Sequence, residues 1–243
     1  GRDHGFGIDD LTVAWAAGEP PDAIDVGQQG ATEGFDDMGA AADAELPWLW
    51  RVESRDDAPR VTGRYADAAG STLWANAVAN FTGAGSYNFA ASAAGDQAVG
   101  GLPGSGAART VTVFGKFRNA AGVAVRNYDV AFGVEKYRNG LTGCAVRLLV
   151  SADGETWGEV GEPTAFAADA DTSGYAADAR PGAAVSVVRR AKFGAALAPG
   201  GVFYLAWQIS AAAGDTTADA QALGIDDVCV RPVTGQSFVL SVD

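Results

Sequence analysis

Short alternations of apolar and polar residues recur along most of the chain, separated by clusters of Gly, Ala, Asp, Asn and Pro. A period of two is typical of β-strands that bury one face, because successive side chains point to opposite sides of a sheet. No long stretch shows the 3.6-residue period of an amphipathic helix. The pattern therefore predicts an all-β protein, an antiparallel β-sandwich of the jelly-roll type.

The clearest strands lie in the second half of the chain. Residues 144–150 and 156–160 flank Asp153-Gly154, a pair typical of a hairpin because glycine adopts a positive φ at little cost. Residues 165–181 are polar and rich in small side chains, which indicates a loop. Further strands are expected at residues 48–52, 86–90, 110–117, 123–137, 185–193, 202–209, 223–230 and 238–242.

A short motif occurs near both ends of the chain. Residues 6–13 read FGIDDLTV and residues 223–230 read LGIDDVCV, with Gly-Ile-Asp-Asp in the same frame. A strand of this kind closes the domain, so the first copy is interpreted as an extra strand, either the end of a preceding module or a segment donated to another copy. The expected divisions are an extra strand at 1–15, a linker at 16–31, the jelly-roll domain at 32–233 and a C-terminal strand or tail at 234–243.

Composition and charge argue against several classes of function. The 243 residues are 48% hydrophobic, enough for one large core, and no apolar run approaches the roughly 18–20 residues of a membrane span. The net charge of −13 argues against a nucleic-acid partner, because such a surface repels phosphates. The chain starts at Gly1 without a signal peptide, which suggests a segment cut from a longer secreted precursor.

No catalytic constellation is visible in the sequence, and an enzyme is not expected. The single histidine, His4, leaves little scope for Ser–His–Asp, Cys–His or zinc chemistry. Glu135 and Arg138 are interpreted as a structural ion pair that organises the Asn139-Gly140 turn, since one carboxylate without a second is not a glycosidase pair.

A set of segments in a fixed order carries a family resemblance. The segments are residues 35–52 (FDDMG…LPWLWRV), 86–100 (SYNFAASAAGDQAVG), 117–122 (FRNAAG), 135–140 (EKYRNG), 149–157 (LVSADGETW), 198–207 (APGGVFYLAW) and the closing GIDDVCV. Together they resemble jelly-roll modules of large secreted bacterial surface proteins, and the closing strand is similar to that of MAM-type and other concanavalin-like sandwiches. The resemblance implies a non-catalytic extracellular β-sandwich used for adhesion, assembly or glycan contact at the cell surface. The extra leading strand departs from the pattern of a self-contained module.

Acidic residues of the closing strand are candidate metal ligands. Asp226 and Asp227 are adjacent in a strand, so their side chains are expected on opposite faces. In MAM-like sandwiches a metal can join one acid of this pair to acids near the first strand, which by the resemblance would here be Glu33, Asp36 or Asp37. Calcium takes about six to eight oxygen ligands, and carboxylates from distant segments can supply them. The resemblance thus implies a calcium site, and the alternative is that these acids only cap turns.

Two tryptophans and two cysteines are further candidates. Trp48 and Trp50 are two residues apart and are expected on one face of a strand. The resemblance assigns Trp50 to the core, which leaves Trp48 as the candidate for stacking on a sugar ring. Cys144 and Cys229 both fall in expected strands and form a disulfide if those strands are neighbours. A buried free pair is the alternative.

Two non-catalytic functions follow. The first is a structural or adhesive subunit that self-associates head to tail into a filament or surface array, each copy donating its extra strand to a sheet edge of the next. The apolar side chains of that strand, the expected assembly residues, are Phe6, Ile8, Leu11, Val13 and Trp15. The alternative is a carbohydrate-binding, lectin-like module of a secreted protein, with glycans as its partners.

Overall fold

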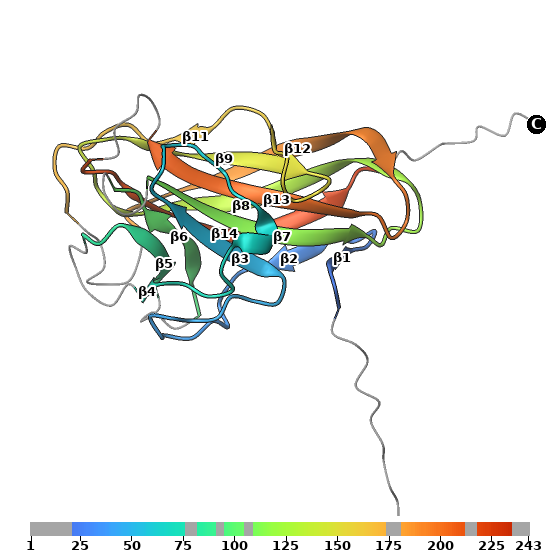
Figure 1. The fold of residues 1–243 in the computed structure, drawn as a ribbon, viewed down its shortest axis with the longest axis horizontal. Helices are drawn as coiled ribbons and strands as arrows, with labels where there is room; N and C mark the ends of the chain where they lie inside the picture. Colours follow the sequence, from blue (N-terminus) through green and yellow to red (C-terminus); the bar gives the residue numbers. More distant parts are fainter. Residues whose placement is uncertain are drawn as a thin grey trace, which may run out of the picture.

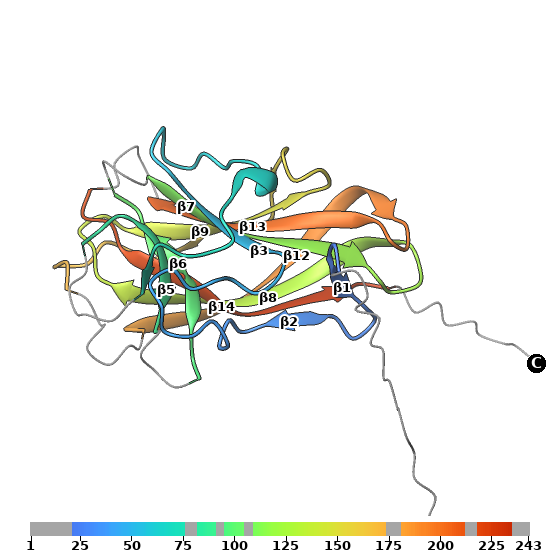
Figure 2. The same ribbon diagram turned by 60° about the horizontal axis from the view of Figure 1, so that its bottom comes forward.

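Two twisted β-sheets stack face to face in the computed structural model, which describes residues 21–75, 82–90, 95–104, 109–173, 181–211 and 218–234 (Figure 1). Turned by 60°, the molecule shows β7, β9 and β13 in one layer and β8, β14 and β2 in the other (Figure 2). The one helical element in the described part of the chain is a 3₁₀ turn at Tyr65–Asp67. No helix in those ranges is long and apolar enough to cross a membrane.

The first sheet has the order β1–β7–β13–β9–β10, with β3 also paired to β7 and β11 to β9. Its strands are β1 (Ile24–Val26), β3 (Trp50–Arg55), β7 (Thr110–Asn119), β9 (Cys144–Ser151), β10 (Gly158–Glu159), β11 (Thr164–Ala165) and β13 (Val202–Ala211). Along one edge of β7, β3 pairs antiparallel with residues 110–115 and β1 pairs parallel with residues 117–119. Two strands thus share this edge in succession, with Lys116 between them.

The second sheet has the order β12–β8–β14–β6–β5–β4, with β2 also paired to β14. Its strands are β2 (Ala31–Glu33), β4 (Trp74–Ala75), β5 (Gly85–Phe89), β6 (Ala98–Leu102), β8 (Val125–Arg138), β12 (Ala183–Leu197) and β14 (Ala222–Pro232). Along β14, residues 223–225 pair with β6 and residues 228–230 pair with β2. Between them the register of β14 against β8 shifts at Asp226, and Asp227 adopts a φ of 49°.

Aromatic rings fill the space between the sheets. Trp207 of β13 is fully buried, and its ring centroid lies 5.5 Å from that of Trp50 and 5.9 Å from that of Phe132 on β8. Trp50 also contacts Phe117 of β7 edge-on at 5.8 Å. Each such side chain stabilises the fold by roughly 1.5–3 kcal/mol when it leaves water. These contacts hold strands from both sheets together.

The predicted all-β sandwich is confirmed, and the boundaries differ in places. Residues 16–31 are not a linker throughout, because β1 lies within them and its Val26 is completely buried. The expected extra strand at 1–15 and most of the expected tail at 234–243 lie outside the described residues. Two strand pairs are parallel rather than antiparallel, namely β1 with β7 and β4 with β5.

The close approach of β6 and β14 requires glycine at position 100. A Cβ added to Gly100 would lie 2.1 Å from the carbonyl oxygen of Leu223 and 2.6 Å from the Cα of Gly224. We expect Gly100→Ala to lower the free energy of unfolding by about 1–3 kcal/mol, because backbone atoms cannot yield as side chains do. Gly27→Ala, where a Cβ meets nothing within 4 Å, is the control and should be nearly neutral. Equal melting temperatures for the two variants would contradict the expectation.

Candidate functional site

The exposed Trp48 is the centre of the candidate site. It lies in the turn before β3, where the amide of Trp50 donates to the carbonyl of Pro47 at 3.0 Å and Leu49 has a left-handed φ of 73°. Trp48 is 63% exposed, whereas Trp50 is 3% exposed and belongs to the core. The two side chains therefore do not share a strand face as the sequence predicted, because the strand begins only at Trp50.

A hydrogen bond fixes the orientation of the Trp48 ring. Its indole N–H donates to the backbone carbonyl of Pro21 at 2.6 Å. The ring is thus a fixed apolar platform that faces solvent, with its one polar atom already satisfied. An indole held in this way loses little conformational freedom when a flat ligand stacks on it.

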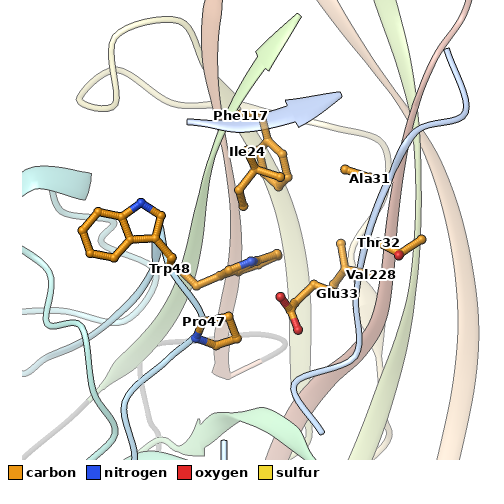
Figure 3. A pocket seen from close by; sticks show the side chains of 9 residues that line it. Ile24, Ala31, Thr32, Glu33, Pro47, Trp48, Phe117 and Val228 are labelled. Atoms are coloured by element: carbon orange, nitrogen blue, oxygen red, sulfur yellow. The ribbon is translucent and has the colours of Figure 1, made fainter. Parts of the chain in front are cut away.

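On one side of Trp48 a slot opens toward the core (Figure 3). This apolar slot has a volume of about 240 Å³ and lies between β1, β2, β14 and the turn that precedes β3. Trp50 and Phe117 contribute aromatic rings to it, and one carboxylate, that of Glu33, lines it. The described residues that line it are Ile24, Ala31, Thr32, Glu33, Pro47, Trp48, Trp50, Phe117 and Val228.

Trp48 also lines a second, larger hollow of about 440 Å³, which contains more polar groups than the slot and is here called the polar hollow. Arg51 stands over the ring of Tyr65 at 4.8 Å from its centroid and donates to the carbonyl of Ala66 at 3.0 Å. Glu45 and Ser71 supply a carboxylate and a hydroxyl. The described residues that line it are Glu45, Leu46, Pro47, Trp48, Leu49, Trp50, Arg51, Tyr65, Gly70 and Ser71. Trp48 therefore adjoins both the apolar slot and the polar hollow.

Sequence reasoning singled out Trp48 and missed the polar hollow. The hollow depends on contacts between segments that carry no strand pattern, through the bridges of Glu45 with Ser71 and of Val52 with Ala69. The alternation of apolar and polar residues along the sequence does not predict such isolated pairings. Residues 60–71 contain two Arg, one Tyr and one Ser, which is not a specific signal for such a hollow.

The Glu33 carboxylate is held at the mouth of the slot by backbone. One of its oxygens accepts the amide of Phe35 at 2.9 Å. Burial raises the pKa of Glu33 above its usual value, and the nearby Asp36 and Asp37 raise it further, while the amides of Phe35 and Gly34 oppose the shift. Glu33 is therefore easier to protonate than a surface glutamate.

The five acids expected to bind calcium do not form a shared ligand set. The pairing of Val228 with Glu33 does bring β2 and β14 side by side. However, an Asp36 oxygen accepts the amide of Gln97 at 3.0 Å and an Asp226 oxygen accepts the amide of Asp227 at 2.6 Å. Within the described ranges, no three His, Cys, Asp or Glu side chains are arranged to hold a metal ion. Calcium binding stays a prediction without a defined set of ligands.

Asp226 is the most perturbed of these acids. It is 6% exposed, and its pKa is raised to about 7, mainly by burial and further by Asp227, Glu135 and Asp36. The amide of Asp227 lowers the pKa and only partly compensates. Asp227 itself is exposed, so the prediction that the adjacent acids differ in their surroundings agrees with their placement.

The predicted ion pair between Glu135 and Arg138 is wrong. Glu135 accepts a hydrogen bond from the Tyr137 hydroxyl, and Arg138 donates to the carbonyl of Ala220 at 2.9 Å, so the two do not form an ion pair. The pairing of β8 with β14 is irregular between them, because the register shifts between Ala222, opposite Arg138, and Leu223, opposite Lys136. Tyr137 instead ends a row of stacked rings, with the Phe89 centroid 4.4 Å away.

Cys144 and Cys229 are free thiols and not a disulfide. Cys144 is buried in β9 of the first sheet, whereas Cys229 lies in β14 of the second. Val228 and Val230 on either side of Cys229 are buried in the core, so alternation points the Cys229 side chain to the opposite face. Burial also raises the pKa of the Cys144 thiol to about 12.

The assembly residues Phe6, Ile8, Leu11, Val13 and Trp15 lie outside the described residues. Their role therefore stays a prediction.

Comparison with known proteins gives likeness at the level of the fold. No family model and no curated protein matches the sequence. Among solved structures, a cleaved adhesin domain of Lys-gingipain from Porphyromonas gingivalis superposes with a TM-score of 0.41 and 11% identity, over 83% of this chain and 96% of that one.

Two polysaccharide-binding domains are similar to a comparable degree. A xylan-binding domain from Paenibacillus barcinonensis has a TM-score of 0.37 and 9% identity, with 86% and 98% of the two chains covered. A cellulose-binding domain from Cellulomonas fimi has a TM-score of 0.35 and 18% identity, with 81% and 98% covered. Likeness at this level identifies no ligand for this chain.

The buried Asp226 predicts a specific pH dependence of stability. Its pKa rises from an ordinary value of 3.8 to about 7 on folding, so the folded chain retains a proton that the unfolded chain releases. Stability should therefore fall as the pH rises from about 4 to about 7. We expect Asp226→Asn to gain about 1–3 kcal/mol at about pH 8 and little at about pH 4, in urea unfolding at each pH.

Asp43→Asn, at an exposed position, is the control and should change stability by less than about 0.5 kcal/mol. Identical pH profiles for Asp226→Asn and the unmodified chain would contradict the expectation. The same series with Ca²⁺ and with EDTA tests the calcium prediction. A calcium site would stabilise the unmodified chain and not the Asp226→Asn variant.

Proposed function

We propose that the chain is a non-catalytic extracellular carbohydrate-binding module that holds a sugar ring against Trp48. The observation that carries the proposal is the exposed indole, which is fixed by its bond to Pro21 and lines two depressions. The apolar face of a pyranose packs on such a ring, while its hydroxyls need polar partners at the side. Trp48 and the polar hollow supply both kinds of surface.

The polar hollow suits hydroxyl groups. The Glu45 carboxylate accepts hydrogen bonds, the Ser71 hydroxyl both donates and accepts, and the Arg51 guanidinium donates. Arg51 is held by the Tyr65 ring and by the carbonyls of Ala66 and Ala68, so it is positioned before a ligand arrives. Fixed donors and acceptors beside an aromatic platform favour weak, selective sugar binding.

The distribution of carboxylates supports a binding function over hydrolysis. Among the described residues, Glu33 lines the apolar slot and Glu45 lines the polar hollow, and neither depression has a second carboxylate from that part of the chain. Glycoside hydrolysis generally requires two carboxylates facing the same bond. A lone acid in each depression can orient a ligand but cannot act as the acid and base of that reaction.

Assembly by strand donation is a second candidate, favoured by one specific observation. In the described chain, β12 (Ala183–Leu197) pairs with β8 alone, so its other edge has no partner strand there. Val185 and Val188 on this strand are 42% and 64% exposed. A long open edge of this kind accepts a strand from another chain.

The carbohydrate proposal predicts a specific effect at Trp48. We expect Trp48→Ala to weaken binding to soluble oligosaccharides by about ten-fold or more, because the stacking surface is lost. Trp74→Ala is the matched control, since Trp74 is also exposed at 44% but lines neither depression. A glycan array selects the ligand, and isothermal titration measures the affinities. An array without binding, or equal losses in both variants, would refute the proposal.

The assembly candidate is tested by removing residues 1–15. We expect filaments or higher oligomers of the full chain, seen by negative-stain electron microscopy and light scattering, to disappear in the truncated chain. Substituting Val188→Lys on the β12 edge should have the same effect, because a charge on the edge opposes strand addition. Monomers in all samples at high protein concentration would remove this candidate.

A further inference from the structure

We propose that the glycan bound at Trp48 carries an acetamido group, whose methyl enters the apolar slot while its N–H donates to the Glu33 carboxylate. The inference rests on the proposed carbohydrate function and identifies the class of sugar that the same site selects. It follows from the different chemistry of the two depressions that adjoin one ring.

The slot is unsuited to a hydroxyl group. Its walls come mainly from Ile24, Ala31, Val228, Trp50 and Phe117, and Trp50 and Phe117 belong to the hydrophobic core itself. A hydroxyl placed against these side chains loses its bonds to water and gains none from them, because Thr32 and Glu33 are the described lining residues with polar side chains. A methyl group placed there leaves water and contacts aromatic and aliphatic carbon, which is favourable.

The slot offers one carboxylate, that of Glu33, as a hydrogen-bond acceptor for a sugar substituent. Glu33 lines the slot with its carboxylate, and one of its oxygens already accepts the amide of Phe35 at 2.9 Å. A carboxylate offers about four acceptor positions over its two oxygens, so a further N–H can be accommodated. The position of Glu33 is determined by β2, which is paired to β14.

An acetamido group is the common sugar substituent that has both properties. It presents a donor N–H and an apolar methyl a short distance apart, whereas a hydroxyl lacks the methyl and a free amine brings a charge into apolar surroundings. Figure 3 shows Trp48 at one side of the slot and Glu33 across it, and Trp50 also lines the slot. A sugar ring on Trp48 would thus have the slot beside it.

The test compares three trisaccharides that share the β-1,4-linked backbone: an N-acetylglucosamine trimer, its deacetylated glucosamine trimer and cellotriose. We expect the acetylated trimer to bind about ten-fold or more tightly than the other two in isothermal titration. Equal affinity for cellotriose would overturn the acetamido inference and leave the carbohydrate function intact. Tighter binding of the glucosamine trimer would also overturn it, because the charge on Glu33 would then be the attraction. Failure of all three trimers overturns the inference, and the glycan array then decides the carbohydrate function separately.

Two variants locate the effect in the slot. Ala31→Leu fills the slot from a partly exposed strand, and Glu33→Gln replaces the carboxylate at constant size. Each should weaken binding of the acetylated trimer by about ten-fold and change that of other glycans found on the array by less than about two-fold. Glu162→Gln, at an exposed position that lines neither depression, is the control for removing a charge. Unchanged preference for the acetylated trimer in both slot variants, with folding verified by circular dichroism, would overturn the inference.

Discussion

The packing of Trp50 between the sheets is the contact on which both the core and the candidate site depend. Its ring centroid lies 4.9 Å from Phe35, 5.8 Å from Phe117 and 5.5 Å from Trp207, so the chain is held there on several sides. The residues just before it must turn sharply away from the strand direction, and Leu49 does so with a left-handed φ of 73°. The turn leaves Trp48 outside. A buried indole and an exposed one thus follow from a single constraint.

The fold was predictable because many strands bury one face against a common core. Residues 110–117, 144–150 and 202–209 alternate clearly and correspond to β7, β9 and β13. The site was only partly predictable. Trp48 could be selected because the resemblance assigns Trp50 to the core. The left-handed backbone of Leu49 between them could not be predicted, because an alternating pattern of apolar and polar residues does not show where a strand begins. The opposite orientations of Cys144 and Cys229 could have been inferred from the valines around Cys229, whereas the sheet to which each strand belongs could not.

Backbone amides donate to three of the acids that this negatively charged chain buries or half-buries, and Glu53 also lies 3.9 Å from Arg55. Phe35 donates to Glu33, Gly63 donates to Glu53, and Asp227 donates to Asp226. In each case burial still dominates and the pKa is raised. A carboxylate that is partly satisfied by amides can remain in place without a metal, and its oxygens are then less available as ligands. This explains how acids from β2 and β14 can be neighbours without forming a set of metal ligands.

The slot can reach the core because two strands share one edge of β7. β3 ends its pairing at Gly115 and β1 begins at Phe117, so a gap one residue long opens in the outer strand at Lys116. Backbone groups at such a gap would normally be left without partners, which is costly where water is excluded. Here the amide of Lys116 donates to the carbonyl of Leu49 at 3.3 Å, in the same turn that presents Trp48. The turn therefore supplies a hydrogen-bond acceptor for the Lys116 amide, where the outer strand is interrupted. The same turn places the Trp48 ring beside the slot, so the slot and the exposed ring occur together.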